Sequence, residues 1–248
     1  MSAIFNPVIA MITLRQLLSR RRTLLLVLLG GVMVLVALGL RLGGEERNAL
    51  NATARLLENL GVRTLMPLVA LIFGTGALGS ELDDGTAVYL LAKPVRRSTT
   101  LLTKLVTAIG CSVLLTSIPF LLAGLLAAGG LGDGLVVGFT VAAVAGTVLY
   151  CAVFVALSLF TRRALIIGLV YVLVWEGLLA GLFPGTQTFS VRQQTLAFAD
   201  AISGVPETVF HADLGLTTAV VVAVILAVGA TLLAIRRLAR IQIAGETA

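Results

Sequence analysis

Long apolar runs dominate the chain, and short segments rich in charged residues separate them. Because a helix of about 20 apolar residues crosses the ~30 Å hydrocarbon core of a bilayer, each run predicts a membrane-spanning helix. The six expected spans cover residues 23–42, 64–80, 99–128, 135–160, 164–183 and 214–235. The third run exceeds a straight crossing, so we expect either a kink at Pro119 or a cytoplasmic extension that carries Lys104. The predicted fold is all-α, integral to the membrane, and a single transmembrane domain over residues 1–248.

The composition excludes a soluble globular protein. Of the 248 residues, 58% are hydrophobic and only 12% are charged, whereas soluble domains carry about 25% charged residues. The two cysteines, Cys111 and Cys151, lie inside apolar runs, and His211 is the single histidine in the sequence. We therefore expect neither a disulfide framework nor a metal site.

The distribution of basic residues predicts the orientation. Thirteen of the eighteen Lys and Arg residues flank the runs on one side: Arg15, Arg20, Arg21, Arg22, Lys93, Arg96, Arg97, Lys104, Arg162, Arg163, Arg236, Arg237 and Arg240. The other five, on the opposite side, are Arg41, Arg47, Arg55, Arg63 and Arg192. Positive residues mark cytoplasmic loops, so both termini are assigned to the cytoplasm. The net charge of +6 thus reflects topology rather than nucleic-acid binding.

Residues 1–22 are expected to form an interfacial helix on the cytoplasmic leaflet. Asn6-Pro7 is a good helix start, with an N-cap residue followed by proline at the first helical position. The polar positions of this helix are Ser2, Asn6, Thr13, Gln16 and Arg20, and the apolar positions are Ile4, Phe5, Val8, Ile9, Ile12 and Leu18. Arg15 departs from this pattern and is expected to snorkel. The alternative is a disordered leader, which the high apolar content disfavours.

The cytoplasmic loop of residues 81–97 combines several unusual features. An acidic cluster of Glu81, Asp83 and Asp84 precedes a glycine turn, and a basic pair, Arg96 and Arg97, ends the loop. Between them lies a short apolar segment of Val88, Tyr89, Leu90 and Leu91, stopped by Lys93-Pro94. Apolar residues between charged flanks are typical of a docking contact. A short helix that lies on the membrane is the alternative.

These residues resemble the six-span permease subunits of type-2 ATP-binding-cassette (ABC) exporters. The resemblance rests on Gly79-Ser80-Glu81, Asp84-Gly85-Thr86, Tyr89-Leu90-Leu91, the run from Lys93 to Arg97, and Lys104. It implies that residues 81–97 are the coupling helix that docks on an ABC ATP-binding subunit. The implied docking residues are Glu81, Asp83, Asp84, Val88, Tyr89, Leu90, Leu91, Arg96 and Arg97. It also implies a homodimer or heterodimer of permeases in the plasma membrane, among membrane lipids, in a bacterium.

The outer loop of residues 184–213 is similar to the re-entrant element of that family. Ser190 and Gln193 have the spacing of a capping box, in which each side chain satisfies the other residue's backbone N–H. An apolar stripe follows at helical spacing: Val191, Thr195, Phe198, Ala199 and Ile202. We therefore expect an amphipathic helix here, before the last span.

The chain carries no ATPase motif of its own. A P-loop needs a lysine inside a glycine-rich Gly-Lys-Ser/Thr sequence, and the lysines Lys93 and Lys104 stand in no such context. We therefore expect no cofactor in this chain, and ATP and Mg on the partner subunit. Asp83-Asp84-Gly85 is similar to the Asp-Gly motif of the alcohol phosphotransferases, in which an Ala-Arg pair and further aspartates follow and complete a metal site. Here Val88-Tyr89 follows, and the next acid is Asp133 across the membrane, so this class is disfavoured.

Glu176 is the acid that lies within a predicted span and away from its ends, beside Trp175. One acid is too few for an ion-coupled pump. Glu176 and Trp175 are candidates for the substrate path, and a hydrogen-bonded structural carboxyl is the alternative for Glu176. The expected function is export of a hydrophobic or amphipathic substrate, such as a drug, lipid or peptide. A secondary transporter or channel, and a membrane assembly factor, are the alternative classes.

Overall fold

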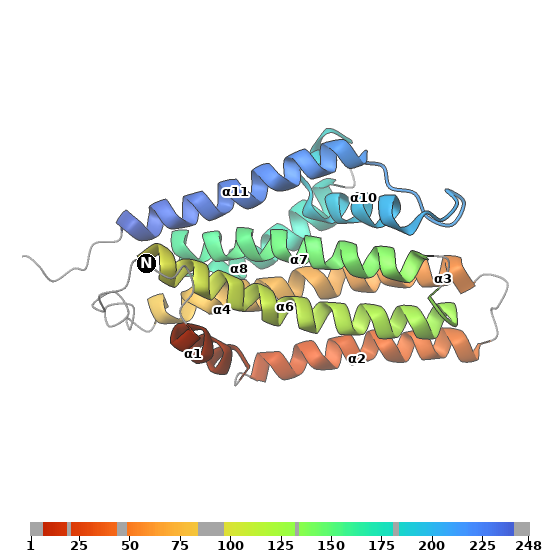
Figure 1. Ribbon diagram of the computed structural model, residues 1–248, viewed down its shortest axis with the longest axis horizontal. Coiled ribbons are helices and arrows are strands. Elements are labelled where there is room, and N and C mark those ends of the chain that lie inside the picture. Colours follow the sequence, from red (N-terminus) through yellow and green to blue (C-terminus); the bar gives the residue numbers. More distant parts are fainter. Residues whose placement is uncertain are drawn as a thin grey trace, which may run out of the picture.

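The computed structural model describes residues 7–18, 21–43, 49–83, 97–131, 134–180 and 184–240. These residues form an elongated bundle of roughly parallel and antiparallel helices (Figure 1). In chain order the helices are α1 (Pro7–Leu18), α2 (Arg21–Leu42), α3 (Ala49–Leu56), η2 (Leu57–Leu65), α4 (Met66–Asp83), α6 (Arg97–Ala128), α7 (Leu135–Phe160), α8 (Ala164–Val170), η4 (Tyr171–Leu179), η5 (Pro184–Phe189), α10 (Val191–Ser203) and α11 (Leu216–Arg240). The expected all-α integral membrane fold is confirmed.

Five helices in the described ranges are long and apolar enough to cross a membrane: Thr23–Leu42, Ala49–Leu78, Ser98–Ala128, Leu135–Phe160 and Leu216–Leu238. The second of them begins at Ala49, earlier than the predicted residue 64, so that prediction is wrong. The reason is that α3, η2 and α4 form one uninterrupted helical stretch. The predicted fifth span is the shorter apolar helix Ala164–Leu179, which falls below the 18 residues of the others. A part of this segment is π-helical, with wider turns and less rise per residue.

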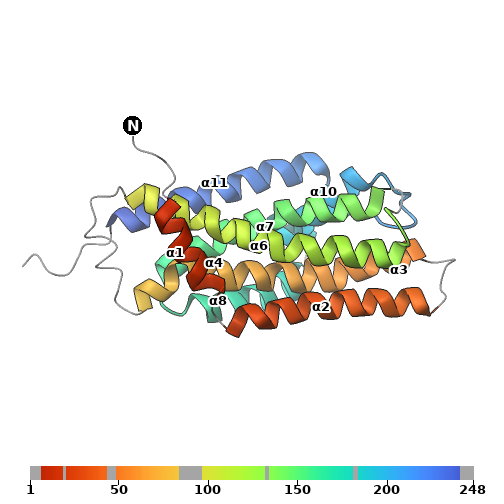
Figure 2. The same ribbon diagram turned by 60° about the horizontal axis from the view of Figure 1, so that its bottom comes forward.

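The two ends of the bundle differ in what they carry. The first described helix α1, the end of α4, the start of α6 and the end of α11 all lie at one end, which we call the termini end (Figures 1 and 2). Helices α3 and α10 lie at the opposite end, which we call the α10 end (Figure 1). The chain therefore brings the described terminal helices and the flanks of the predicted docking loop to the same side, as the charge pattern requires.

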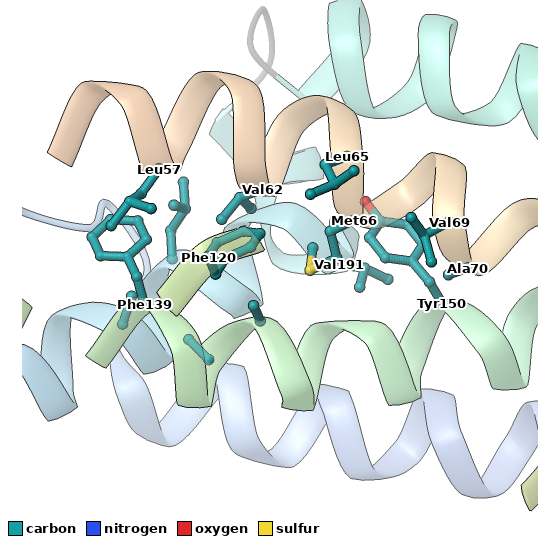
Figure 3. Packing of buried hydrophobic residues seen from close by; sticks show 14 of the residues in the cluster. Leu57, Val62, Leu65, Met66, Val69, Ala70, Phe120, Phe139, Tyr150 and Val191 are labelled. Carbon is teal, nitrogen blue, oxygen red and sulfur yellow. The ribbon is translucent and has the colours of Figure 1, made fainter. Parts of the chain in front are cut away.

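A continuous buried core runs along the middle of the bundle, where η2 and α4 face α7 (Figure 3). Leu57, Val62, Leu65 and Met66 are almost completely buried, and Tyr150 stacks on Phe154 with ring centroids 5.6 Å apart. Lipid tails are as apolar as these side chains, so moving the side chains out of lipid gains little hydrophobic free energy. Close van der Waals packing therefore holds such helices together. At Gly61 a side chain would collide with the ring of Phe120, which shows how closely these helices approach.

Helix α1 packs across the termini end rather than lying apart from the bundle. Leu17 is buried, and the hydroxyl of Thr23 donates to its carbonyl oxygen at 2.8 Å, which ties α1 to α2. Thr13, one of the expected polar positions, is buried, and its hydroxyl donates to Ile9 O at 2.8 Å, so no polar group is left unpaired there. Ile12 and Leu18, on the expected apolar face, are exposed on the outside. The predicted helix start at Asn6 lies outside the described residues.

Candidate functional site

The predicted docking loop borders two described helices. Glu81 and Asp83 belong to the last turn of α4, so the helix extends three residues further than expected, and Arg97 is the first residue of α6. The other predicted docking residues, Asp84, Val88, Tyr89, Leu90, Leu91 and Arg96, lie outside the described residues. The docking role of all nine residues stays a prediction.

Lys104 stabilises the end of α4 just before this loop. Its side chain is completely buried between α4 and α6, and its ammonium donates to the carbonyl oxygen of Ala77 at 3.1 Å. A carbonyl in the last turns of a helix lies at the negative end of the helix dipole, which favours a cation there. Lys104 therefore connects the two helices that flank the loop.

At the α10 end, the sequence sets both limits of α10. The hydroxyl of Ser190 accepts the backbone N–H of Gln193 at 3.2 Å, as the predicted N-cap requires. The reciprocal half of the capping box is replaced, because the N–H of Ser190 donates to Gln187 O at 3.0 Å. Gly204 ends the helix with a left-handed φ of 61°, a conformation that glycine adopts readily.

The predicted stripe of α10 is largely correct. Val191, Thr195 and Ala199 are buried and Phe198 is half-buried, whereas Ile202 is 46% exposed. Ile202 departs from the prediction because α10 packs on α7 along a face that ends at Ser203. A Cβ built at Gly138 of α7 would lie 2.8 Å from the backbone nitrogen of Ser203, and one at Gly146 would lie 2.2 Å from Thr195 Oγ1. Glycines thus let α10 pack closely along α7, and the re-entrant nature of this segment stays a prediction.

The carboxylate of Glu176, in η4, accepts hydrogen bonds from the first turn of α10. Its side chain is buried, and Oε1 accepts hydrogen bonds from Tyr171 Oη and from the backbone N–H of Val191, each at 3.0 Å. Oε2 accepts from the hydroxyl of Ser190 and, at 3.4 Å, from the N–H of Arg192. The first N–H groups of a helix lack partners within the helix and carry a partial positive charge, so a carboxylate at this place is stabilised. The Glu176 carboxylate thus contacts the predicted re-entrant segment.

An ion pair joins the same turn of α10 to η2. Arg192 Nη2 lies 3.0 Å from Glu58 Oε1, and both side chains are partly buried. The two residues are 134 positions apart in the chain, so the pair fixes how α10 lies relative to η2. Together with the three bonds that Ser190, Val191 and Arg192 donate to Glu176, it attaches the start of α10 to two separate helices.

A cavity of about 370 Å³ lies beside this junction, between η2, α4, α7, η4 and α10. Its polar lining residues are Arg63, Thr64, Tyr150, Glu176 and Arg192. Its other lining residues are Leu68, Val172, Leu173, Val174, Gly177 and Leu178. Trp175, a predicted member of the substrate path, is half-buried and does not belong to this lining, so its role stays a prediction.

Sequence reasoning missed Arg63, Thr64, Tyr150 and Arg192 as neighbours of Glu176. Arg63 stands one residue before a predicted span and Arg192 stands in the outer loop, so the sequence indicates only a topological role for each. A tyrosine in a long apolar run, such as Tyr150, gives no signal of its own. Only the fold-back of α10 shows that these residues meet.

A protein-family model matches this sequence. The model, described as the ABC-2 family transporter protein, covers residues 8–241, which is nearly the whole chain. None of the curated proteins matches the chain closely enough to count as a relative. The match favours the ABC permease over the secondary transporter, channel and assembly factor that the sequence left open. This family supplies the membrane component of the transporter and associates with an ATP-binding subunit. The chain belongs to the ABC-2 transporter family, as a multi-pass permease of an ABC transporter.

Proposed function

We propose that this permease exports a hydrophobic or amphipathic molecule across a bacterial plasma membrane, driven by ATP hydrolysis on a separate subunit. The observation that carries the proposal is the family match over residues 8–241 in a chain without a P-loop. The sparse charge inside the predicted spans supports an apolar or amphipathic cargo. The thirteen basic residues on one side support a cytoplasmic location of both termini and of residues 81–97.

In this proposal the loop of residues 81–97 is the coupling helix. Two copies of the chain, or this chain and a second permease, form the pathway, and two ATP-binding subunits dock below them. ATP-driven approach of these subunits pushes on the loops and shifts the spans between inward-facing and outward-facing states. Lys104 supports the transmission of this push, because it bonds α6 to the end of α4 next to the loop.

Reconstitution of the chain with its ATP-binding subunit tests the proposal. We expect a detergent-stable complex whose ATP hydrolysis rises when the permease is present, and ATP-dependent efflux of a fluorescent amphipathic dye from cells or vesicles. The control is the same complex with the catalytic glutamate of the ATP-binding subunit replaced by Gln. Efflux that persists without ATP hydrolysis, or that follows an ion gradient instead, contradicts the proposal.

A further inference from the structure

Two residues that line the cavity at the α10 end carry a buried hydrogen-bond donor without an acceptor among the described residues. Tyr150 is completely buried and lines the cavity, and its hydroxyl lies beside Glu176 without a hydrogen bond of normal geometry to any described residue. Figure 3 shows this hydroxyl pointing toward the helix that carries Leu65 and Met66. The buried Nε of Arg192 also lacks a partner in the described part of the chain. Buried polar groups are nearly always paired, so these two donors indicate a missing acceptor.

Two arginines, Arg63 and Arg192, lie at the cavity, and the acids near them are Glu176 in the lining and Glu58 outside it. The carboxylate of Glu176 already accepts four hydrogen bonds, and Glu58 is paired with Arg192. Both acids are therefore occupied by groups of the protein itself. Arg63 is exposed at the cavity, and within the described ranges it makes no ion pair. The group that fits beside Arg63, Arg192 and Tyr150 is an anion that only accepts hydrogen bonds, such as a carboxylate or a phosphate.

The apolar part of the lining gives the second property of the ligand. Leu173, Val174 and Leu178 belong to the lining and are 62%, 44% and 55% exposed, so the apolar wall continues onto the outside of the bundle. A volume of about 370 Å³ lies at the lower end of the range for small-molecule sites, roughly 300–1,000 Å³. This size suits a polar head group with the first part of a hydrocarbon chain, whose remainder extends along the exposed leucines and valines.

The backbone around the cavity supports a binding role. Arg63 and Thr64 belong to the π-helical segment η2, and Val172, Val174 and Glu176 belong to the π-helical segment η4. The wide turn of η2 is visible in its bonds, because Met66 N donates to Gly61 O and Thr64 Oγ1 donates to Asn59 O, each five residues back. Segments of π-helix are rare and are frequently found at functional sites. Here two of them border one cavity.

We propose that this cavity binds the head group of an anionic amphiphile, held by Arg63, the Nε of Arg192 and the hydroxyl of Tyr150. The hydrocarbon chain lies against Leu173, Val174 and Leu178. This inference deepens the proposed export function by naming the chemical class of a bound molecule. Binding itself needs no ATP-binding subunit, so the two proposals fail in different experiments.

Tryptophan fluorescence offers a direct test, because Trp175 is the single tryptophan of the chain and stands between Val174 and Glu176. The full-length protein, purified in a neutral detergent, is titrated with three dibrominated quenchers: phosphatidylglycerol, stearic acid and uncharged monoacylglycerol. We expect saturable quenching by the anionic probes at concentrations where the uncharged probe quenches weakly. The ratio of the two anionic affinities distinguishes a phosphate from a carboxylate head group.

Three variants make the test specific. Arg63→Gln removes the arginine that makes no ion pair within the described ranges, and we expect it to weaken anionic binding about tenfold. Tyr150→Phe removes only the hydroxyl, preserves the ring stacked on Phe154, and is expected to weaken binding several-fold. Arg55→Gln is the matched control, because Arg55 is exposed in the same helical stretch and does not line the cavity. Equal quenching by the uncharged probe, or unchanged affinity in both Arg63→Gln and Tyr150→Phe, would overturn the proposal.

Discussion

The carboxylate of Glu176 accepts the backbone N–H of Val191 at 3.0 Å, which joins an apolar membrane segment to the first turn of α10. A glutamate in such a segment is costly unless its charge is compensated. Here the compensation comes from the unpaired N–H groups at the start of a helix and from the hydroxyls of Tyr171 and Ser190. The acid in the span and the helix after it are therefore one structural unit.

The first prediction is that Glu176→Gln destabilises the protein. In the native protein both carboxylate oxygens accept hydrogen bonds, so the NH2 group of the new amide faces hydroxyl or N–H donors in place of one oxygen. The substitution also removes the negative charge that the helix dipole favours. We expect a loss of about 2 kcal/mol, seen as a lower melting temperature in detergent. Glu207→Gln, in an exposed turn, is the control and should melt like the native protein. A normal melting temperature together with lost transport would show that Glu176 serves the cargo instead.

A second prediction concerns the two glycines of α7 against which α10 packs, Gly138 and Gly146. Gly138→Ala brings a methyl group within 3 Å of the Ser203 backbone, and Gly146→Ala brings one close to Thr195 Oγ1. We expect each change to cost about 1–3 kcal/mol, because two helices must separate. Gly110→Ala in α6, where no atom lies within 4 Å of the new methyl group, should melt at or slightly above the native temperature. If all three variants melt alike, α10 does not pack on α7 as described.

The third prediction concerns the ion pair of Arg192 with Glu58. A double-mutant cycle with Arg192→Gln and Glu58→Gln should give a coupling energy of about 1 kcal/mol, since both side chains are partly buried. The same cycle with the exposed Arg162→Gln in place of Arg192→Gln should be additive. Additivity in the first cycle would mean that the pair does not hold α10 on η2.

The sequence predicted the spans because long apolar runs have few other interpretations. It placed the start of the second span at residue 64 because Arg55, Glu58 and Arg63 interrupt the apolar pattern. In the structure Arg55 and Arg63 are exposed, Glu58 pairs with Arg192, and Leu57 and Val62 on the same stretch are buried. A window of mean hydropathy cannot separate the two faces of such a helix.

The cavity was not predictable from the sequence, because its residues come from five helices. Ser190 and Gln193 correctly predicted the start of α10, since an N-cap is a local signal in the sequence. Nothing local places Ser190 against Glu176, or Arg192 against Glu58, because these contacts depend on how α10 folds back. Sequence periodicity describes one helix at a time, whereas this site is defined by the packing of several.

A fourth prediction tests the orientation of the chain in the membrane. In intact cells, a membrane-impermeant maleimide should label a cysteine introduced at Glu45 and should not label one introduced at Leu90. The native Cys111 and Cys151 are buried and serve as a low background. Labelling at position 90, or protection at position 45, would reverse the proposed topology.

The central claim is that residues 81–97 dock on an ATP-binding subunit, and the affinity of Tyr89→Ala for that subunit tests it most directly. If Tyr89 is the buried anchor of the contact, its removal should weaken binding by about 2 kcal/mol or more, roughly 30-fold in Kd. Phe189→Ala replaces an exposed aromatic residue at the α10 end, and it should leave Kd unchanged. Equal affinity of the native protein and Tyr89→Ala, with both proteins folded, would contradict the account.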